Sequence, residues 1–96
     1  MITLERACKI ASRDFSRNYG VNCIYSITDC GDKWNIVADF GSVNYSGGGN
    51  IFVDKSTGKI TDVPIEYEII ALINASPELE VPKEYILKNK YSIQKK

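Results

Sequence analysis

The chain of 96 residues contains no histidine. This absence excludes Ser-His-Asp triads, Cys-His pairs, HExxH metal sites and imidazole general bases. No apolar run approaches the roughly 20 residues that span a membrane, so we expect no membrane partner. Twelve basic residues balance twelve acidic ones, so no net charge draws the whole chain to polyanions. We expect a non-enzymatic protein without a cofactor.

The three cysteines, Cys8, Cys23 and Cys30, are an odd number without CxxC spacing. Zinc-binding and thioredoxin-like chemistry are therefore not favoured. Glu5 and Arg6 stand where a secretory signal peptide would need apolar residues. A reduced, cytoplasmic protein fits this pattern, and Cys8 is expected in the core as a small apolar side chain.

Hydrophobic periodicity predicts one α+β domain over residues 1–82, with a helix packed on a four-stranded antiparallel sheet. Over residues 3–19, apolar side chains recur at steps of three and four, with Thr3 as the cap and residues 18–20 as the stop. A period of two then predicts two hairpins, with strands near 21–28, 34–40, 51–53 and 59–63. In the first strand one face is predicted to carry Val21, Cys23, Tyr25 and Ile27, with Ile24 as the exception.

A second helix is predicted over residues 64–74, with Asp62 as its cap and Pro64 at its start. The β-branched pair Ile69 and Ile70 leaves a strand as the alternative. Residues 77–82 are expected to be extended.

One turn and one aromatic residue have predicted structural roles. Trp34 shares a strand face with other apolar residues and is expected to anchor the core. At the head of the DKSTG turn, the Asp54 carboxylate is expected to accept hydrogen bonds from backbone N–H groups further along. Gly58 is placed for a positive φ.

Charge is unevenly distributed along the chain. Residues 20–82 hold three lysines against nine acidic residues, a net charge of −6, whereas residues 83–96 hold five lysines and one glutamate, a net charge of +4. We therefore expect an acidic body followed by a basic C-terminal tail at 83–96. Tyr85, Tyr91 and the lysines around them give an alternative function, in which the tail binds single-stranded nucleic acid.

The glycine-rich segment GSVNYSGGGN at 41–50 is predicted to be a loop, and a strand rather than a Walker A lysine and helix follows it. It displays Asn44, Tyr45 and Asn50, which are suited to partner contacts. The acidic residues Asp29, Asp32 and Asp39 lack the alternating spacing of a calcium loop, so we predict no metal site and interpret them as a face for a basic partner. These residues together are the predicted partner-binding set.

Four segments carry a family resemblance: the helix that opens with Met1-Ile2-Thr3, residues 34–40, the hairpin IFVDKSTGKI at 51–60, and the apolar helix containing Tyr67. Together they resemble the YrhB-like small bacterial proteins, which are grouped among the immunity proteins of polymorphic toxin systems. The resemblance spans most of residues 1–75 and carries over structural roles at Trp34, Asp54 and Gly58. VDKxTG hairpins also occur in cystatin-like and PepSY-like domains, which share a helix laid across an antiparallel sheet.

The resemblance implies a cystatin-like fold and a cytoplasmic bacterial protein that neutralises a cognate toxin by steric occlusion, without catalysis. The implied partner is the toxin protein, and the sequence leaves open whether the chain is a monomer or a homodimer. Two alternatives stay open: a small nucleic-acid-binding module that uses the basic tail, and a chaperone-like or PepSY-like inhibitory domain.

Overall fold

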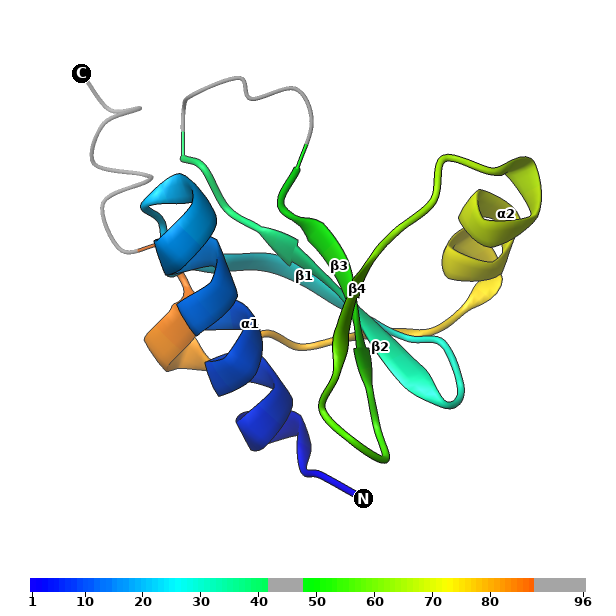
Figure 1. Ribbon diagram of the computed structural model, residues 1–96, viewed down its shortest axis with the longest axis horizontal. Coiled ribbons are helices and arrows are strands. Elements are labelled where there is room, and N and C mark those ends of the chain that lie inside the picture. Colours follow the sequence, from blue (N-terminus) through cyan, green and yellow to red (C-terminus); the bar gives the residue numbers. More distant parts are fainter. Residues whose placement is uncertain (42–47, 88–96) are drawn as a thin grey trace.

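The computed structural model of the protein describes residues 1–41 and 48–87. The elements follow in the order α1 (Leu4–Tyr19), β1 (Ile24–Asp29), β2 (Lys33–Ala38), β3 (Asn50–Asp54), β4 (Ile60–Asp62), α2 (Tyr67–Ala75), β5 (Glu78–Leu79) and the 3-10 turn η1 (Lys83–Tyr85). The predicted α+β class is confirmed, because an N-terminal helix lies on an antiparallel sheet and a second helix follows the strands (Figure 1). Neither helix in these two described stretches has the length and apolar content needed to cross a bilayer.

Helix α1 begins and ends where nearby residues satisfy its free backbone groups. The Thr3 hydroxyl accepts the Arg6 N–H at 3.1 Å. At the other end Gly20 adopts a left-handed φ of 73° and donates its N–H to the Ser16 carbonyl. The predicted helix, its cap and its glycine stop are confirmed.

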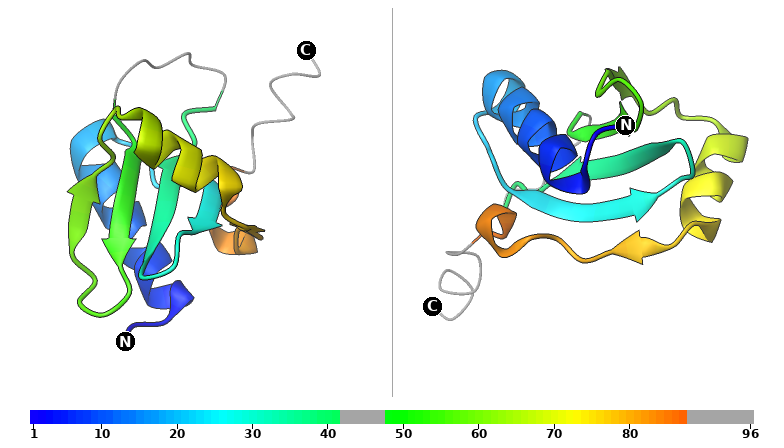
Figure 2. Two further views of the ribbon diagram at one scale, coloured as in Figure 1. Left: turned by 90° about the vertical axis from the view of Figure 1, so that its right-hand side faces the viewer. Right: turned by 90° about the horizontal axis from the view of Figure 1, so that it is seen from below.

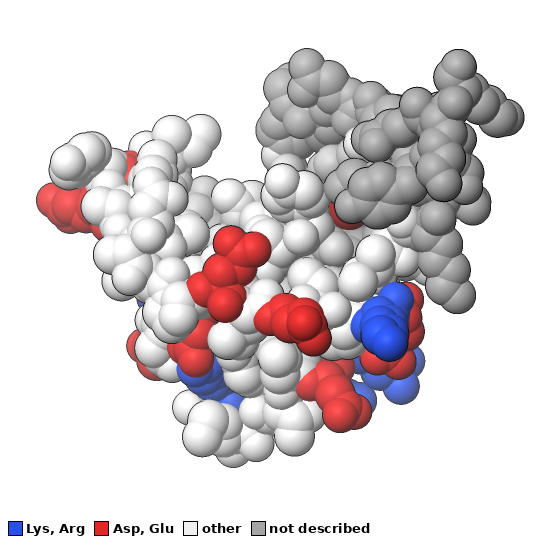
Figure 3. Space-filling model, turned by 180° about the vertical axis from the view of Figure 1, so that it is seen from behind, with Lys and Arg blue, Asp and Glu red and all other residues white. Residues whose placement is uncertain are grey.

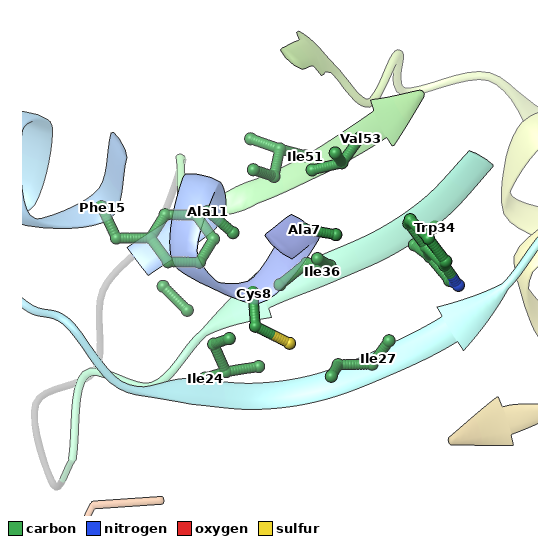
Figure 4. Close-up of a cluster of buried hydrophobic side chains, with 11 residues drawn as sticks. Ala7, Cys8, Ala11, Phe15, Ile24, Ile27, Trp34, Ile36, Ile51 and Val53 are labelled. Carbon is green, nitrogen blue, oxygen red and sulfur yellow. The ribbon is translucent and has the colours of Figure 1, made fainter. Parts of the chain in front are cut away.

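The core lies between α1 and one face of the sheet. Figure 4 shows the side chains of α1 directed at apolar side chains from β1, β2 and β3. Ala7 and Ala11 are small, so the helix axis approaches the strands closely, and Phe15 fills the space near the helix end. Trp34 is 6% exposed and belongs to this cluster, and Cys8 is fully buried in it, as predicted.

Within the described residues the sheet has five strands in the order β4-β3-β2-β1-β5, all antiparallel. The four predicted strands are present, and the fifth lies within residues 77–82, which were expected to be extended but were not assigned to the sheet. Strand β5 adds to the free edge of β1, where Leu79 pairs with Ile27 and Glu78 with Thr28. Two residues are too few to show a periodicity, and their partners lie about fifty positions earlier in the chain, so only the tertiary structure forms this strand.

A bulge in β1 overturns the predicted assignment of its faces. Ile24 pairs with Ala38 and Ser26 with Val37, so one extra residue, Tyr25, is inserted in β1. Tyr25 is consequently 62% exposed rather than in the core. Ile24, predicted as the exception, is buried in the core together with Ile27, because the inserted residue turns both side chains to the same face.

The turn between β3 and β4 has the predicted geometry. The Asp54 carboxylate accepts the N–H groups of Ser56 and Thr57 at 2.8 and 2.9 Å. These bonds hold its pKa below the ordinary value. Gly58 has φ +76°, and a Cβ there would lie 3.0 Å from the Ile10 Cδ1 atom, so both conformation and space favour glycine.

The second helix is confirmed, but its start and its cap differ from the prediction. Strand β4 runs through Asp62, and the next N–H, that of Val63, donates to the Asn50 carbonyl. Asp62 is thus held in the sheet and cannot cap a helix. Helix α2 begins at Tyr67 after Glu66, which makes no side-chain capping bond.

The two helices lie on opposite sides of the sheet. In the left panel of Figure 2, α2 crosses in front of the strands while α1 lies behind them, and the right panel shows β5 along the sheet edge next to β1. The face covered by α1 is the apolar core face. The second face of the sheet is thereby left to face α2.

Candidate protein-binding surface

The described members of the predicted partner-binding set lie at two opposite ends of the sheet. Asp29 and Asp32 are at the β1–β2 turn. Asp39 follows the far end of β2, and Asn50 begins β3 at that same far end. The antiparallel register separates the two pairs by the length of the strands. The three aspartates therefore do not form one acidic patch.

Asp29 is engaged in the scaffold. Its carboxylate accepts the Lys55 ammonium at 2.7 Å and the Gly31 N–H at 3.0 Å, and these bonds, the one from Lys55 first, lower its pKa. The Lys55 Nζ also lies 5.1 Å from the centroid of the Trp34 ring. Asp32 differs, since its backbone carbonyl accepts the Lys55 N–H while its side chain stays 83% exposed. Only Asp32 of this pair offers a partner a largely exposed carboxylate.

Asp39 is nearly buried, with 8% of its surface exposed. Its carboxylate accepts the Gly41 N–H at 2.8 Å, and its own N–H donates to the Cys23 carbonyl. These contacts fix the chain as it leaves β2. In this position Asp39 offers a partner little contact area.

Asn50 belongs to a polar pair on the second face of the sheet. The Asn35 side-chain amide donates to the Asn50 Oδ1 at 2.5 Å and to the Ile51 carbonyl at 3.1 Å. Asn35 is only 2% exposed, so both bonds compensate for its burial. The predicted contacts of Asn44 and Tyr45 lie outside the described residues.

A groove separates the second face of the sheet from α2. Its volume is about 390 Å³. Mostly polar side chains from the strands form one wall, and mostly apolar side chains of α2 and the segments flanking it form the other. The strands contribute Ser26, Thr28, Asn35, Val37, Asn50 and Glu78, and the α2 side contributes Val63, Ile70, Ile73, Asn74 and Ser76.

Helix α2 is apolar and yet has no buried residue. Ile70 and Leu72 are 44% and 40% exposed. The segment before the helix adds Ile65, which is 95% exposed, and the first helical residue, Tyr67, is 86% exposed. Large apolar side chains that are held in water gain free energy when a partner covers them. This helix and the groove beneath it are therefore the candidate protein-binding surface.

Sequence reasoning predicted the helix but placed partner binding elsewhere. A signal was present in the chain, because YEIIALINA carries apolar residues on every side of a helix. Such a pattern is equally typical of a fully buried helix. The decision between burial and exposure depends on whether another layer covers α2, which local sequence does not encode.

Cys8 and Cys23 are poorly suited to nucleophilic chemistry. Burial, with smaller contributions from Glu84 and Glu5, raises the pKa of Cys8 to about 11, so its thiol stays protonated at neutral pH. Burial and then Asp39 raise the pKa of Cys23. Within residues 1–41 and 48–87, no three His, Cys, Asp or Glu side chains gather where they would hold a metal ion.

Comparison with known proteins finds no matching family model, no matching curated protein and no matching solved structure.

Proposed function

We propose that this protein is an immunity protein, which binds a cognate bacterial toxin in the cytoplasm and neutralises it by steric occlusion without catalysis. One observation carries the proposal: α2 and the segment before it hold large apolar side chains in water, most of all Ile65 and Tyr67. A surface of this kind gains free energy when a partner covers it. The resemblance to YrhB-like proteins supplies the class of partner.

Occlusion requires a rigid body of sufficient size. Stable protein complexes typically bury ~800 Å² on each partner and depend on a few anchoring side chains. The core on the other side of the sheet fixes β1, β2 and β3, whose second face forms one wall of the groove. The exposed side chains of Tyr67, Ile70 and Leu72 are candidate anchors.

A protein partner is favoured over nucleic acid at this surface. Residues 60–82, which include α2, contain five acidic residues and no lysine or arginine. Phosphate groups would be repelled there. The nucleic-acid alternative depends on the lysines of 83–96, and residues 88–96 lie outside the described part of the chain.

Co-expression with the toxin tests the proposal. We expect the neighbouring reading frame to encode a toxin, and cells that produce it should survive only when this protein is also produced. Purified toxin and protein should also elute together in size-exclusion chromatography. Equal rates of cell death with and without the protein would contradict the proposal for that pair.

Two further measurements separate the alternatives. Binding to single-stranded DNA that collapses with added salt, and disappears on deletion of residues 83–96, would favour the nucleic-acid module. Equal affinity for several unrelated unfolded proteins would favour the chaperone-like alternative.

A further inference from the structure

The acidic arm, defined as residues 60–82, combines charge of one sign with exposed apolar side chains. Its acidic residues are all exposed, and no basic residue interrupts them: they are Asp62, Glu66, Glu68, Glu78 and Glu80. Figure 3 shows the molecule from behind, where acidic side chains are spread over the surface and basic ones are few. Apolar contact with this arm would therefore take place in a negative field.

The groove gives the arm a place for inserted side chains. Its volume of about 390 Å³ leaves room for side chains of a partner. Ile70 and Ile73 form an apolar wall, while Asn35 and Asn50 face them from the sheet. The two asparagines already bond to each other, so they present a fixed wall rather than unsatisfied groups. An aliphatic side chain that enters beside α2 would contact both isoleucines.

The negative charge of the acidic arm favours one kind of binding partner over another. If a second copy bound through the same surface, two arms that each carry acidic residues and no basic ones would meet, and like charges brought together at an interface oppose binding. A partner that carries lysine or arginine around an aliphatic side chain would gain from both features. Such a partner would also associate faster, and its affinity would fall with added salt.

We infer that the acidic arm is the docking site for a basic protein surface, which places an aliphatic side chain in the groove beside Ile70 and Ile73. This inference rests on the proposed function for its biological setting and specifies the chemistry of the partner. It also moves the binding site from the sheet ends marked by Asp29 and Asp39 to α2 and the second face of the sheet.

A designed peptide tests the inference without the toxin. The probe is a helical 14-residue peptide of lysine and leucine with one apolar face, and the matched control replaces each lysine with glutamate. We expect the lysine peptide to bind the full chain and to shift amide NMR signals within residues 60–82 and at Asn35 and Asn50. Its affinity should fall about tenfold between low and high salt, and the glutamate peptide should not bind.

Charge reversal at two pairs of glutamates distinguishes binding at the acidic arm from attraction of the lysine peptide to the net charge of the whole protein. Glu66→Lys with Glu68→Lys should weaken binding of the lysine peptide about tenfold. Glu5→Lys with Glu84→Lys changes the net charge equally outside the arm and should leave the affinity within about twofold. Equal losses in the two variants, signals that shift on α1 instead, or equal binding of the glutamate peptide would overturn the inference.

The inference and the proposed function fail separately. If the peptide binds the arm but the toxin stays active, the proposed function is wrong and the docking chemistry stands. If the toxin is neutralised equally well by the Glu66→Lys, Glu68→Lys variant, the proposed function stands and the inference is wrong.

Discussion

The contrast between a core residue and an α2 residue gives the sharpest test of the structure. Ile27 is completely buried between the sheet and α1, whereas Leu72 on α2 is 40% exposed. Each is changed to alanine in a separate variant, and Ile27→Val serves as a milder core change. The two alanine variants remove similar amounts of aliphatic side chain from opposite sides of the sheet.

The expected losses in the free energy of unfolding follow from burial. Replacing a buried isoleucine by alanine typically costs about 2–5 kcal/mol, because transfer energy is lost and a cavity remains, and Ile27→Val should cost about 0.5–1.5 kcal/mol. Full burial of a leucine side chain contributes about 1.5–3 kcal/mol. Leu72 retains much of its exposure, its truncation encloses no cavity, and alanine favours helix. Leu72→Ala should therefore cost less than about 1 kcal/mol.

Urea unfolding followed by fluorescence of the single tryptophan, Trp34, measures these differences. A domain of this size has a total stability of roughly 5–15 kcal/mol, so the Ile27→Ala variant should still show a folded baseline in urea. If it does not, the Ile27→Val variant takes its place in the comparison. If Leu72→Ala lowers the free energy of unfolding as much as Ile27→Ala does, α2 belongs to the core. In that case α2 would not be an exposed docking helix.

Three further predictions concern the scaffold. Asn35→Ala removes a buried donor that bonds to a β3 carbonyl and to the neighbouring asparagine, so the free energy of unfolding measured in urea should fall by about 1–3 kcal/mol. Asp29→Asn should cost about 0.5–1 kcal/mol at pH 6, where the wild-type carboxylate pairs with Lys55. Because the folded-state pKa of Asp29 is below the ordinary 3.8, its contribution is present above that value and lost as the pH falls through the folded-state pKa, so thermal unfolding of the two proteins should converge in acid. Gly58→Ala should lower the free energy of unfolding by about 1–2 kcal/mol, which is more than Gly31→Ala should lower it. Both glycines have a positive φ, but of the two only Gly58 has a neighbour that an added Cβ would meet. Equal losses in the two variants would contradict this crowding at Gly58.

Several features of the fold were predictable because they depend on neighbours in the sequence. The Thr3 cap acts three residues away, and the Asp54 carboxylate acts two and three residues away. Gly58 provides its own backbone freedom. Trp34 was predictable as a core residue because alternation along β2 fixes its face. Interactions between residues that are so close in the sequence can be predicted from the order of the residues alone.

Other features needed partners from distant parts of the chain. The bulge at Tyr25 shifts the register between β1 and β2, so a period of two failed there. Asp62 was predicted to cap a helix, but pairing with β3 holds it in the sheet. The asparagine pair that lines the groove joins the buried Asn35 to the exposed Asn50 across two strands. The candidate site is made of such features.

The sequence by itself determined the class of the domain, its first helix, its hairpin turns and the acidic character of residues 60–82. Only the tertiary structure decided that the apolar residues of α2 stay exposed and that a groove separates them from the second face of the sheet. The reason is physical. Propensity, capping and charge are local properties, whereas the burial of a helix depends on whether another surface lies within contact distance of it.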